Sequence, residues 1–338
     1  MEPMRQDPFA APVAAPVATR TVAPARGSAT LSAPASPLGP ASPLSAATLS
    51  EIAREPGRAR PGPGEVHIVD QMIAERSEGL RSHPLWPVMR PVIYRALGYR
   101  QAVELADTVA TMSALGAFEH ASSLLDLDIH SVGLDRVPRA GGFVAVANHP
   151  TGIADGIAMH DLLSPVRDDV VFMANRDALR VNVRLVDKLI PVEWREGHKT
   201  STKTRETLRQ TARAIGRGAA LVIFPSGRLA RWTDDGLTEQ DWMPSAVALA
   251  KKNRLPIVPI HVGSRNSGLF YLVSRFSQEL RDMTVFHELL NKRGRRFDFT
   301  IGRPIDAVGL GEAADATHAL QHFVTDVLPD DPDAAFGG

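Results

Sequence analysis

Short apolar runs alternate with segments of helical period after residue 125, and no other feature of the sequence limits the fold as strongly. The apolar runs are Phe143–Ala147, Val170–Met173, Leu221–Phe224, Ile257–Val262 and Phe297–Ile301. The helical segments are Ala154–Leu163, Ala178–Leu189, Ser201–Arg217, Ser245–Lys252 and Gly268–Leu280. Strands that alternate with helices form sheets covered by helices. The sequence therefore predicts an α/β fold with a mixed central sheet and flanking helices.

Two regions of different texture precede this α/β part. Residues 1–62 are rich in Ala, Pro and Ser without a helical or strand period, so we expect a disordered arm, with a docking segment as the functional alternative. Apolar residues recur at three- and four-residue spacing over residues 63–125, which predicts a helical N-terminal region. The predicted domains are these two regions and an α/β domain over residues 126–328.

One segment of the helical region suits a membrane surface. It combines aromatic rings with arginines, namely Trp86, Tyr94 and Tyr99 beside Arg90, Arg95 and Arg100. Such a helix suits the headgroup layer of an anionic bilayer, although packing on the protein's own core is equally compatible. We see neither a transmembrane run nor a signal peptide in the sequence. We therefore expect a cytoplasmic protein that is peripheral on the cytoplasmic membrane face.

The composition excludes several classes of function. Lys and Arg number 38, as do Asp and Glu, so the net charge does not indicate a nucleic-acid partner. The chain has no cysteine, which excludes a disulfide scaffold, a thiolate zinc site and a cysteine nucleophile. It also fits a reducing compartment.

The first candidate site follows the apolar run that ends at Ala147. His149 stands just beyond this run, Gly152 allows a tight turn, and Asp155 begins the next helical segment with five residues between it and His149. A carboxylate on one imidazole nitrogen fixes the tautomer and raises the basicity of the other nitrogen. Such a pair can take a proton from a hydroxyl or amine. A capping Asp beside a surface His is the structural alternative.

A second candidate site follows the run Leu221–Phe224. The turn contains Ser226 and Gly227, and Arg228 and Arg231 follow at once. Arginine suits the recognition of phosphate or carboxylate groups. Solvated arginines at an ordinary strand–turn–helix junction are the alternative.

The fourth apolar run, Ile257–Val262, contains Pro259 and follows Pro256. Because proline removes a donor from a strand ladder, this run is predicted to be an edge or terminal strand.

Together these stretches resemble the PlsC-type lysophospholipid acyltransferase family over residues 127–306. His149 and Asp155 look like its His-x4-Asp motif, and the other blocks look like Ile190–Arg195, Phe224–Arg228, Leu255–Pro259 and Ile301–Ile305. The five-residue spacing, with Pro150 and Gly152 inside, is similar to a putative-hemolysin-like branch of the superfamily. Ser226 stands where the third block of the family has Glu, which makes acceptors other than lysophosphatidic acid more plausible.

The resemblance implies an O-acyltransferase of phospholipid biosynthesis. A fatty acyl thioester, on coenzyme A or acyl carrier protein, would donate to the hydroxyl of a lysophospholipid-type acceptor. His149 would be the general base and Asp155 would orient it. Backbone N–H groups near Gly152 or Gly227 are candidate oxyanion donors.

The acceptor would be bound by the remaining candidate residues. These are Ser226, Gly227 and Arg228, with Arg195 and Arg231 as further candidates. The resemblance implies no metal or other cofactor, and His160 beside His149 and Asp155 matches no recognised ligand spacing.

Two alternatives remain open at this stage. The acceptor could be another lyso-lipid, such as a lyso-ornithine lipid. The chain could also be a non-catalytic lipid-binding protein on the same fold, if the longer loop keeps His149 and Asp155 apart. The sequence leaves the oligomeric state open.

A basic stripe adds a possible contact surface. Residues 176–231 contain 13 Lys and Arg against five Asp and Glu, and Arg205, Arg209, Arg213 and Arg217 recur every fourth residue beside an apolar stripe of Leu208, Ala212 and Ile215. Such a helix could contact anionic headgroups, the phosphates of coenzyme A or acyl carrier protein. A solvated helix face is the alternative.

Overall fold

The computed structural model describes residues 66–193, 196–233 and 236–337. The chain begins there with helices that share one apolar cluster with Met283 from later in the sequence. They are α2 (Ile68–Arg76), α3 (Glu78–Arg81), α4 (Trp86–Ala96) and α5 (Tyr99–Val109). Helix α6 (Ala114–Leu125) follows and packs through Phe118 and Leu125 in the cluster of the central sheet. The prediction of helices in this region is therefore confirmed. The predicted disordered arm lies outside the described residues.

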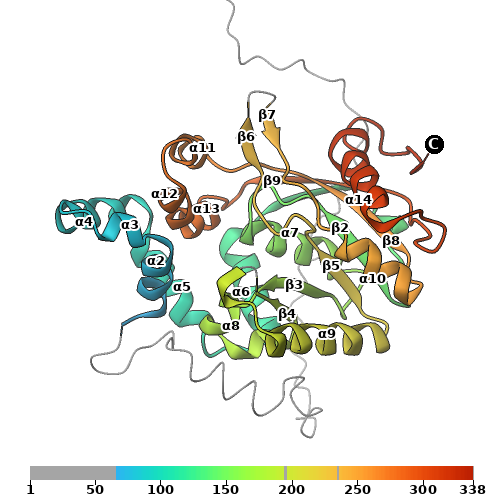
Figure 1. Cartoon of the computed structure of the whole chain (residues 1–338), viewed down its shortest axis with the longest axis horizontal. Helices are drawn as coiled ribbons and strands as arrows, with labels where there is room; N and C mark the ends of the chain where they lie inside the picture. Colours follow the sequence, from blue (N-terminus) through green and yellow to red (C-terminus); the bar gives the residue numbers. More distant parts are fainter. Residues whose placement is uncertain (1–65, 194–195, 234–235, 338) are drawn as a thin grey trace, which may run out of the picture. The chain divides into compact units, whose positions relative to one another are not determined.

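A seven-stranded sheet follows and forms the centre of the structure (Figure 1). Its strands are β1 (Asp128–Val132), β2 (Phe143–Ala147), β3 (Val171–Asn175), β4 (Leu189–Val192), β5 (Ala220–Ile223), β8 (Ile257–Gly263) and β9 (Arg296–Ile301). Their order is β1-β9-β8-β2-β5-β3-β4. All neighbours are parallel except β8 and β9, so the predicted mixed sheet is confirmed.

Helices cover both faces of this sheet. They are α7 (Ile153–Leu163), α8 (Asp177–Val181), α9 (Ser201–Gly216), α10 (Ser245–Asn253), α11 (Gly268–Ser274), α12 (Gln278–Met283), α13 (Val285–Leu290) and α14 (Ala313–His322). Single helical turns add η1 (Leu134–Arg136), η2 (Val183–Asp187), η3 (Glu196–His198) and η4 (Phe323–Val327). A separate hairpin, β6 (Arg231–Thr233) and β7 (Gly236–Thr238), projects beside the sheet (Figure 1).

The central strand β2 explains how the two layers form. Successive side chains of a strand point to opposite faces. Phe143, Ala145 and Ala147 accordingly join the apolar cluster that includes α7, whereas Val144 and Val146 join the cluster that includes α10 and α14. Every residue of β2 is fully buried, as expected for a strand covered on both faces.

The prediction that Ile257–Val262 is an edge strand is wrong. This run is β8, which lies between β9 and β2 in the interior of the sheet. Pro259 fits inside the sheet because the regular β8–β9 hydrogen-bond ladder does not include it. Ile257 pairs with Ile305, and the regular ladder resumes at Ile260 and Ile301, so Pro259 lies where no regular donor is needed.

Two predicted helices also differ. The segment Ala178–Leu189 is short α8, then η2, and its last residue begins β4, because Asn182 caps η2 through a bond from the Arg184 N–H. The segment Gly268–Leu280 is divided into α11 and α12, since Ser277 caps a new helix.

Helix α9 packs on the sheet through a mostly polar face. It buries Glu206, Gln210, Thr211 and Ala214, and leaves Leu208 62% exposed. Hydrogen bonds among the buried polar groups compensate for their burial, since Gln210 donates to Glu206 and Thr211 donates to the Thr207 carbonyl. Leu208 and Ala212 of the apolar stripe are exposed, and the contact surface stays a prediction.

No boundary at residue 125 or 126 divides the described chain, which belongs to one compact unit. Since Met283 packs among the N-terminal helices, the helical region shares its core with the later part of the chain. The division into three domains stays a prediction. No described helix is long and apolar enough to cross a membrane.

Candidate active site

The loop that follows β2 is tied to the neighbouring strand β8. The Asn148 side chain donates to the Val262 carbonyl at 3.0 Å and accepts from the Val262 N–H at 2.7 Å. Parallel strands carry the loops of their carboxyl ends at one edge of the sheet, where α/β proteins place their sites. These two bonds fix the point at which His149 leaves β2.

The loop brings His149 and Asp155 together. His149 Nδ1 lies 2.9 Å from Asp155 Oδ2, although five residues separate the two in the sequence. Asp155 is fully buried and accepts bonds from the N–H groups of Thr151 and Gly152 at 2.8 and 2.9 Å, and from the Thr151 hydroxyl. Gly152 has φ of +87°, which lets the chain turn into α7. The longer spacing therefore preserves the contact.

The direction of this contact is not that of an ideal hydrogen bond. Among the described residues Nδ1 makes no aligned hydrogen bond, so its contact with Asp155 is a close approach of 2.9 Å. Catalytic hydrogen bonds are often poorly aligned without substrate and tighten in the substrate complex.

The imidazole ring rests on the end of β5. The rings of His149 and Phe224 are stacked, with centroids 4.3 Å apart and planes inclined by 21°. The His149 side chain keeps 19% of its surface exposed. One nitrogen faces buried Asp155, so the other is available to a reactant.

Glu239 is a site residue that the sequence analysis missed. It follows β7, and its Oε1 accepts a 2.7 Å bond from the Ser226 hydroxyl. Burial raises the pKa of Glu239, against the Ser226 bond and the positive charge of His149, which lower it. The carboxyl group of Glu239 thus lies next to Ser226. This is the position at which the third block of the family has Glu and this chain has none.

The two predicted oxyanion donors are engaged within the protein. The Gly152 N–H donates to Asp155, and the Gly227 N–H donates to the Phe224 carbonyl at 3.0 Å. Gly152 thus has a clear role in the loop, while its oxyanion role stays a prediction that requires these bonds to rearrange.

The predicted acceptor-binding residues are placed differently from one another. Ser226 is buried in the turn after β5, Gly227 is half-buried, and Arg228 and Arg231 are exposed. Arg195 lies outside the described residues. Both arginines follow the turn that holds Ser226, and their role in binding an acceptor stays a prediction.

The described residues contain no group of three or more His, Cys, Asp or Glu side chains suited to hold a metal ion. His160 is buried in α7, where its ring packs against Phe118 with centroids 5.0 Å apart. Burial lowers the pKa of His160, with a smaller contribution from Lys188, so the neutral form is favoured. That the reaction needs no cofactor stays a prediction.

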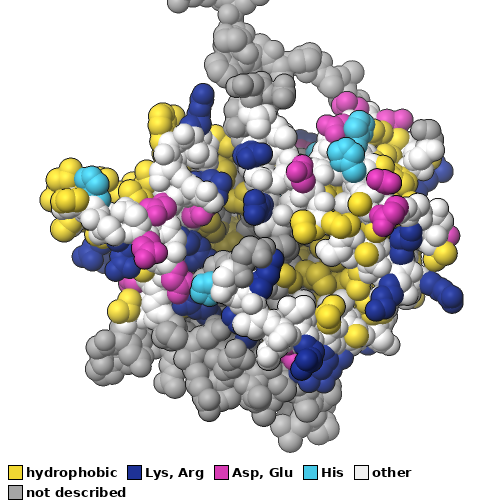
Figure 2. Space-filling view, in the orientation of Figure 1, with side chains coloured by type: hydrophobic (Ala, Val, Ile, Leu, Met, Phe, Trp, Pro, Cys, Tyr) yellow, Lys and Arg dark blue, Asp and Glu magenta, His cyan; other side chains and the backbone are white. Residues whose placement is uncertain are grey.

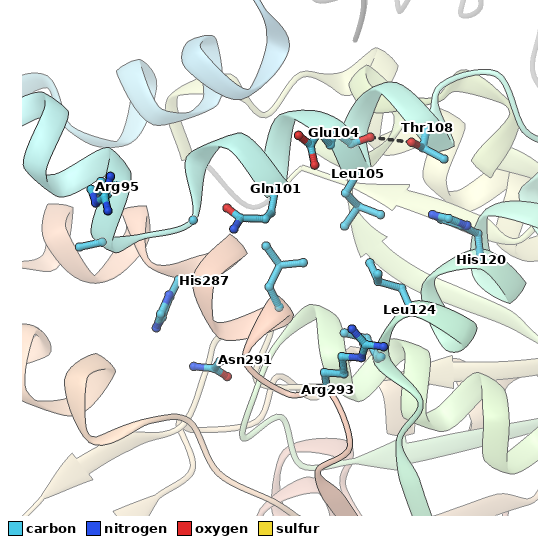
Figure 3. A pocket seen from close by; sticks show the side chains of 14 residues that line it. Arg95, Gln101, Glu104, Leu105, Thr108, His120, Leu124, His287, Asn291 and Arg293 are labelled. Atoms are coloured by element: carbon cyan, nitrogen blue, oxygen red, sulfur yellow. Dashed lines mark hydrogen bonds between the residues drawn. The ribbon is translucent and has the colours of Figure 1, made fainter.

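A cavity of about 600 Å³ lies apart from these residues, between α5, α6 and α13 (Figure 3). Leucines form its apolar part, and Arg95, His120, His287 and Arg293 lie around it. Its described lining includes none of the predicted site residues. The cavity therefore does not belong to the His149 site.

Together, a helix-covered mixed sheet and a buried-carboxylate–histidine pair at the end of its central strand define an enzyme-like site. Comparison with known proteins also indicates an enzyme. The family model described as Acyltransferase matches residues 128–263. Lyso-glycine lipid O-acyltransferases of Phocaeicola vulgatus and Bacteroides thetaiotaomicron are 25% and 24% identical to the chain, and each comparison covers 55% of the chain and 67% or 69% of the relative.

These findings support the resemblance to the PlsC-type lysophospholipid acyltransferase superfamily. The prediction of an O-acyltransferase is confirmed, and the narrower putative-hemolysin-like branch stays a prediction. The crystal structure of the 1-acyl-sn-glycerophosphate acyltransferase PlsC from Thermotoga maritima is 12% identical, with a TM-score of 0.42 over 70% of this chain and 94% of that chain.

Proposed function

We propose that this enzyme transfers a fatty acyl group from an acyl thioester to the hydroxyl of a lysolipid at a membrane surface. The 2.9 Å approach of His149 Nδ1 to buried Asp155 is the observation that carries the proposal. When the proton of the imidazole is on Nδ1, next to Asp155, Nε2 is the basic nitrogen.

The proposed reaction needs only these groups and the two substrates. Nε2 of His149 takes the proton of the acceptor hydroxyl, and the oxygen attacks the thioester carbonyl carbon. The carbon–sulfur bond then breaks, and the thiolate leaves with the proton carried by the imidazolium. Asp155 stabilises that imidazolium, and no acyl-enzyme forms.

We favour an acylated amino-acid lipid over lysophosphatidic acid as the acceptor. Two relatives are named for a lyso-glycine lipid. In addition, Ser226 stands where the third block of the family has Glu. A lysophospholipid other than lysophosphatidic acid is the second candidate.

The test offers labelled acyl-CoA and acyl carrier protein donors to a panel of lyso-glycine, lyso-ornithine and lysophospholipid acceptors. We expect transfer by the wild type and a fall of at least about 100-fold in His149→Ala, as for loss of a general base. His318→Ala, at an exposed histidine of α14, serves as the matched control. Equal rates in His149→Ala and the wild type would disprove the mechanism.

The membrane surface that we propose lies on α4 and α11. Leu85, Val88 and Val92 share one face of α4 at helical spacing, and they are 58%, 72% and 68% exposed. On α11 and just beyond it, Leu272 and Phe276 are 55% and 80% exposed. Figure 2 shows hydrophobic side chains gathered over α4 at the left edge of the molecule, with basic side chains beside them.

Charge favours an anionic bilayer as the partner of this surface. Residues 81–103 contain Arg81, Arg90, Arg95 and Arg100 and no acidic residue. Each basic residue near an anionic surface contributes about 1 kcal/mol to binding. An exposed apolar helix face flanked by arginines is typical of a helix that lies in the interface.

Vesicle sedimentation tests this surface. We expect Val88→Ser/Val92→Ser to reduce binding to phosphatidylglycerol vesicles about tenfold, with Val308→Ser as the control at a 55% exposed valine elsewhere. Unchanged binding of the double variant would exclude α4 as the contact.

A further inference from the structure

Glu239 holds the main chain of His149 from a distant part of the sequence. The His149 N–H lies 3.2 Å from each oxygen of the Glu239 carboxylate, across 90 positions of sequence. Leaving a buried hydrogen-bonding group without its partner costs about 1–3 kcal/mol. The carboxylate therefore fixes the residue that carries the imidazole.

The carbonyl of His149 is held by the same segment. The Ala230 N–H donates to the His149 carbonyl at 3.1 Å. Ala230 precedes β6 and Glu239 follows β7, so the two ends of this hairpin hold the main chain of His149 through its N–H and its carbonyl. The residues at the two open ends of the hairpin thus contact the candidate active site.

Ser226 links this arrangement to the turn after β5. Its hydroxyl has two acceptors, Glu239 Oε1 at 2.7 Å and the Arg228 carbonyl at 2.9 Å, and it is buried. A single hydroxyl proton satisfies one acceptor at a time. Ser226 therefore supports the carboxylate that in turn supports His149.

We propose that Glu239 is a positioning residue that holds the His149 main chain and so directs its imidazole toward the acceptor hydroxyl. This inference rests on the proposed acyl transfer. Asp155 sets the imidazole from one side and Phe224 supports the ring, while Glu239 sets the backbone from which the side chain extends. A shift of about 1 Å in a reacting group can cost on the order of 100-fold in rate.

Three variants test the proposal. Glu239→Ala removes both bonds, and we expect kcat to fall about 10- to 100-fold with KM for the acyl donor unchanged. Glu239→Gln keeps an oxygen that can accept from Ser226 and from the His149 N–H, so its kcat should stay within about threefold of the wild type. Asp241→Ala removes an exposed carboxylate two residues away and is the matched control.

Ser226→Ala extends the test if Glu239→Ala does not fold. We expect it to lower kcat about threefold to tenfold, and by the same factor in a Glu239→Gln background, because the Gln oxygen keeps the bond with Ser226. A Ser226→Ala or Glu239→Ala enzyme whose kcat lies within about twofold of the wild type would overturn the proposal. A rise in KM with kcat unchanged would do the same.

Hydrogen exchange gives a readout that does not depend on acyl transfer. Glu239→Ala should raise the exchange rate of the His149 amide at least about tenfold, while Asp241→Ala should not. Unchanged exchange at His149 would overturn the positioning role. A wild type without any acyl transfer would instead contradict the proposed function, and the exchange data would still decide whether Glu239 holds His149.

Discussion

The imidazole of His149 lies on the ring of Phe224, with 4.3 Å between the ring centroids. Phe224 comes directly after β5, so the support of the ring is as rigid as the sheet. Since an aromatic contact contributes about 0.5–1.5 kcal/mol, we expect Phe224→Leu to lower kcat about threefold to tenfold. Phe323→Leu, at a buried ring in the opposite layer, should lower the melting temperature without lowering kcat per folded molecule.

Asp155 contributes to the site through its charge. In Asp155→Asn one oxygen remains for the N–H groups of Thr151 and Gly152, but the imidazolium loses its partner. We expect kcat to fall about 100- to 10,000-fold with only a small change in stability. Steady-state kinetics with matched urea denaturation measure both. A variant with more than about a tenth of the wild-type kcat would contradict the assigned role.

Substitution by alanine should have opposite effects on stability at Gly152, in the loop after β2, and at Gly156, in α7. Gly152 has φ of +87°, and a Cβ there would lie 2.9 Å from a methyl carbon of Leu229. Gly152→Ala should therefore cost about 1–3 kcal/mol in the free energy of unfolding and lower activity. A Cβ at Gly156, inside α7, meets nothing within 4 Å, so Gly156→Ala should stabilise the protein by about 0.5–1 kcal/mol. Urea denaturation compares the two, and equal effects would disprove the argument.

Asp161 predicts a pH dependence of stability. Burial raises its pKa from 3.8 to about 6, against a hydrogen bond with Ser122 that lowers it. The folded state thus favours the protonated form, so the contribution of Asp161 to stability is present below pH 3.8 and is lost as the pH rises through about 6.

Asp161→Asn should consequently be more stable than the wild type at about pH 8. We expect a difference on the order of 1 kcal/mol, because solvent screens a partly exposed group, and the difference should disappear below about pH 4. Asp315→Asn, at an exposed carboxylate in the first turn of α14, should show no such gain. A constant difference at all pH values would contradict the prediction.

The central elements of the fold could be predicted from the sequence because their patterns are local. Phe143–Ala147 is an uninterrupted apolar run, and β2 has these bounds. The edge strand β1 was not predicted, because Asp128 and His130 alternate with other residues over only five positions and the strand exists through its pairing with β9. The stability of β1 depends on tertiary contacts, which a short sequence pattern does not predict.

The candidate site could be predicted where its residues are neighbours in sequence. His149 and Asp155 share one loop, and glycine at 152 signals the turn that joins them. Glu239 carries no such signal, since it lies beyond a hairpin whose position depends on tertiary contacts. The ring of Phe224 was part of a recognised run, but only the structure shows that His149 rests on it.

The burial of β2 sets the order in which the protein can come apart. Its residues are fully buried between two layers, and regions of this kind open only with global unfolding. His149 lies two positions beyond the last residue of that strand, and the intervening Asn148 ties it to β8. Heat or denaturant should therefore loosen the exposed α4 while catalysis persists, and activity should end together with the sheet.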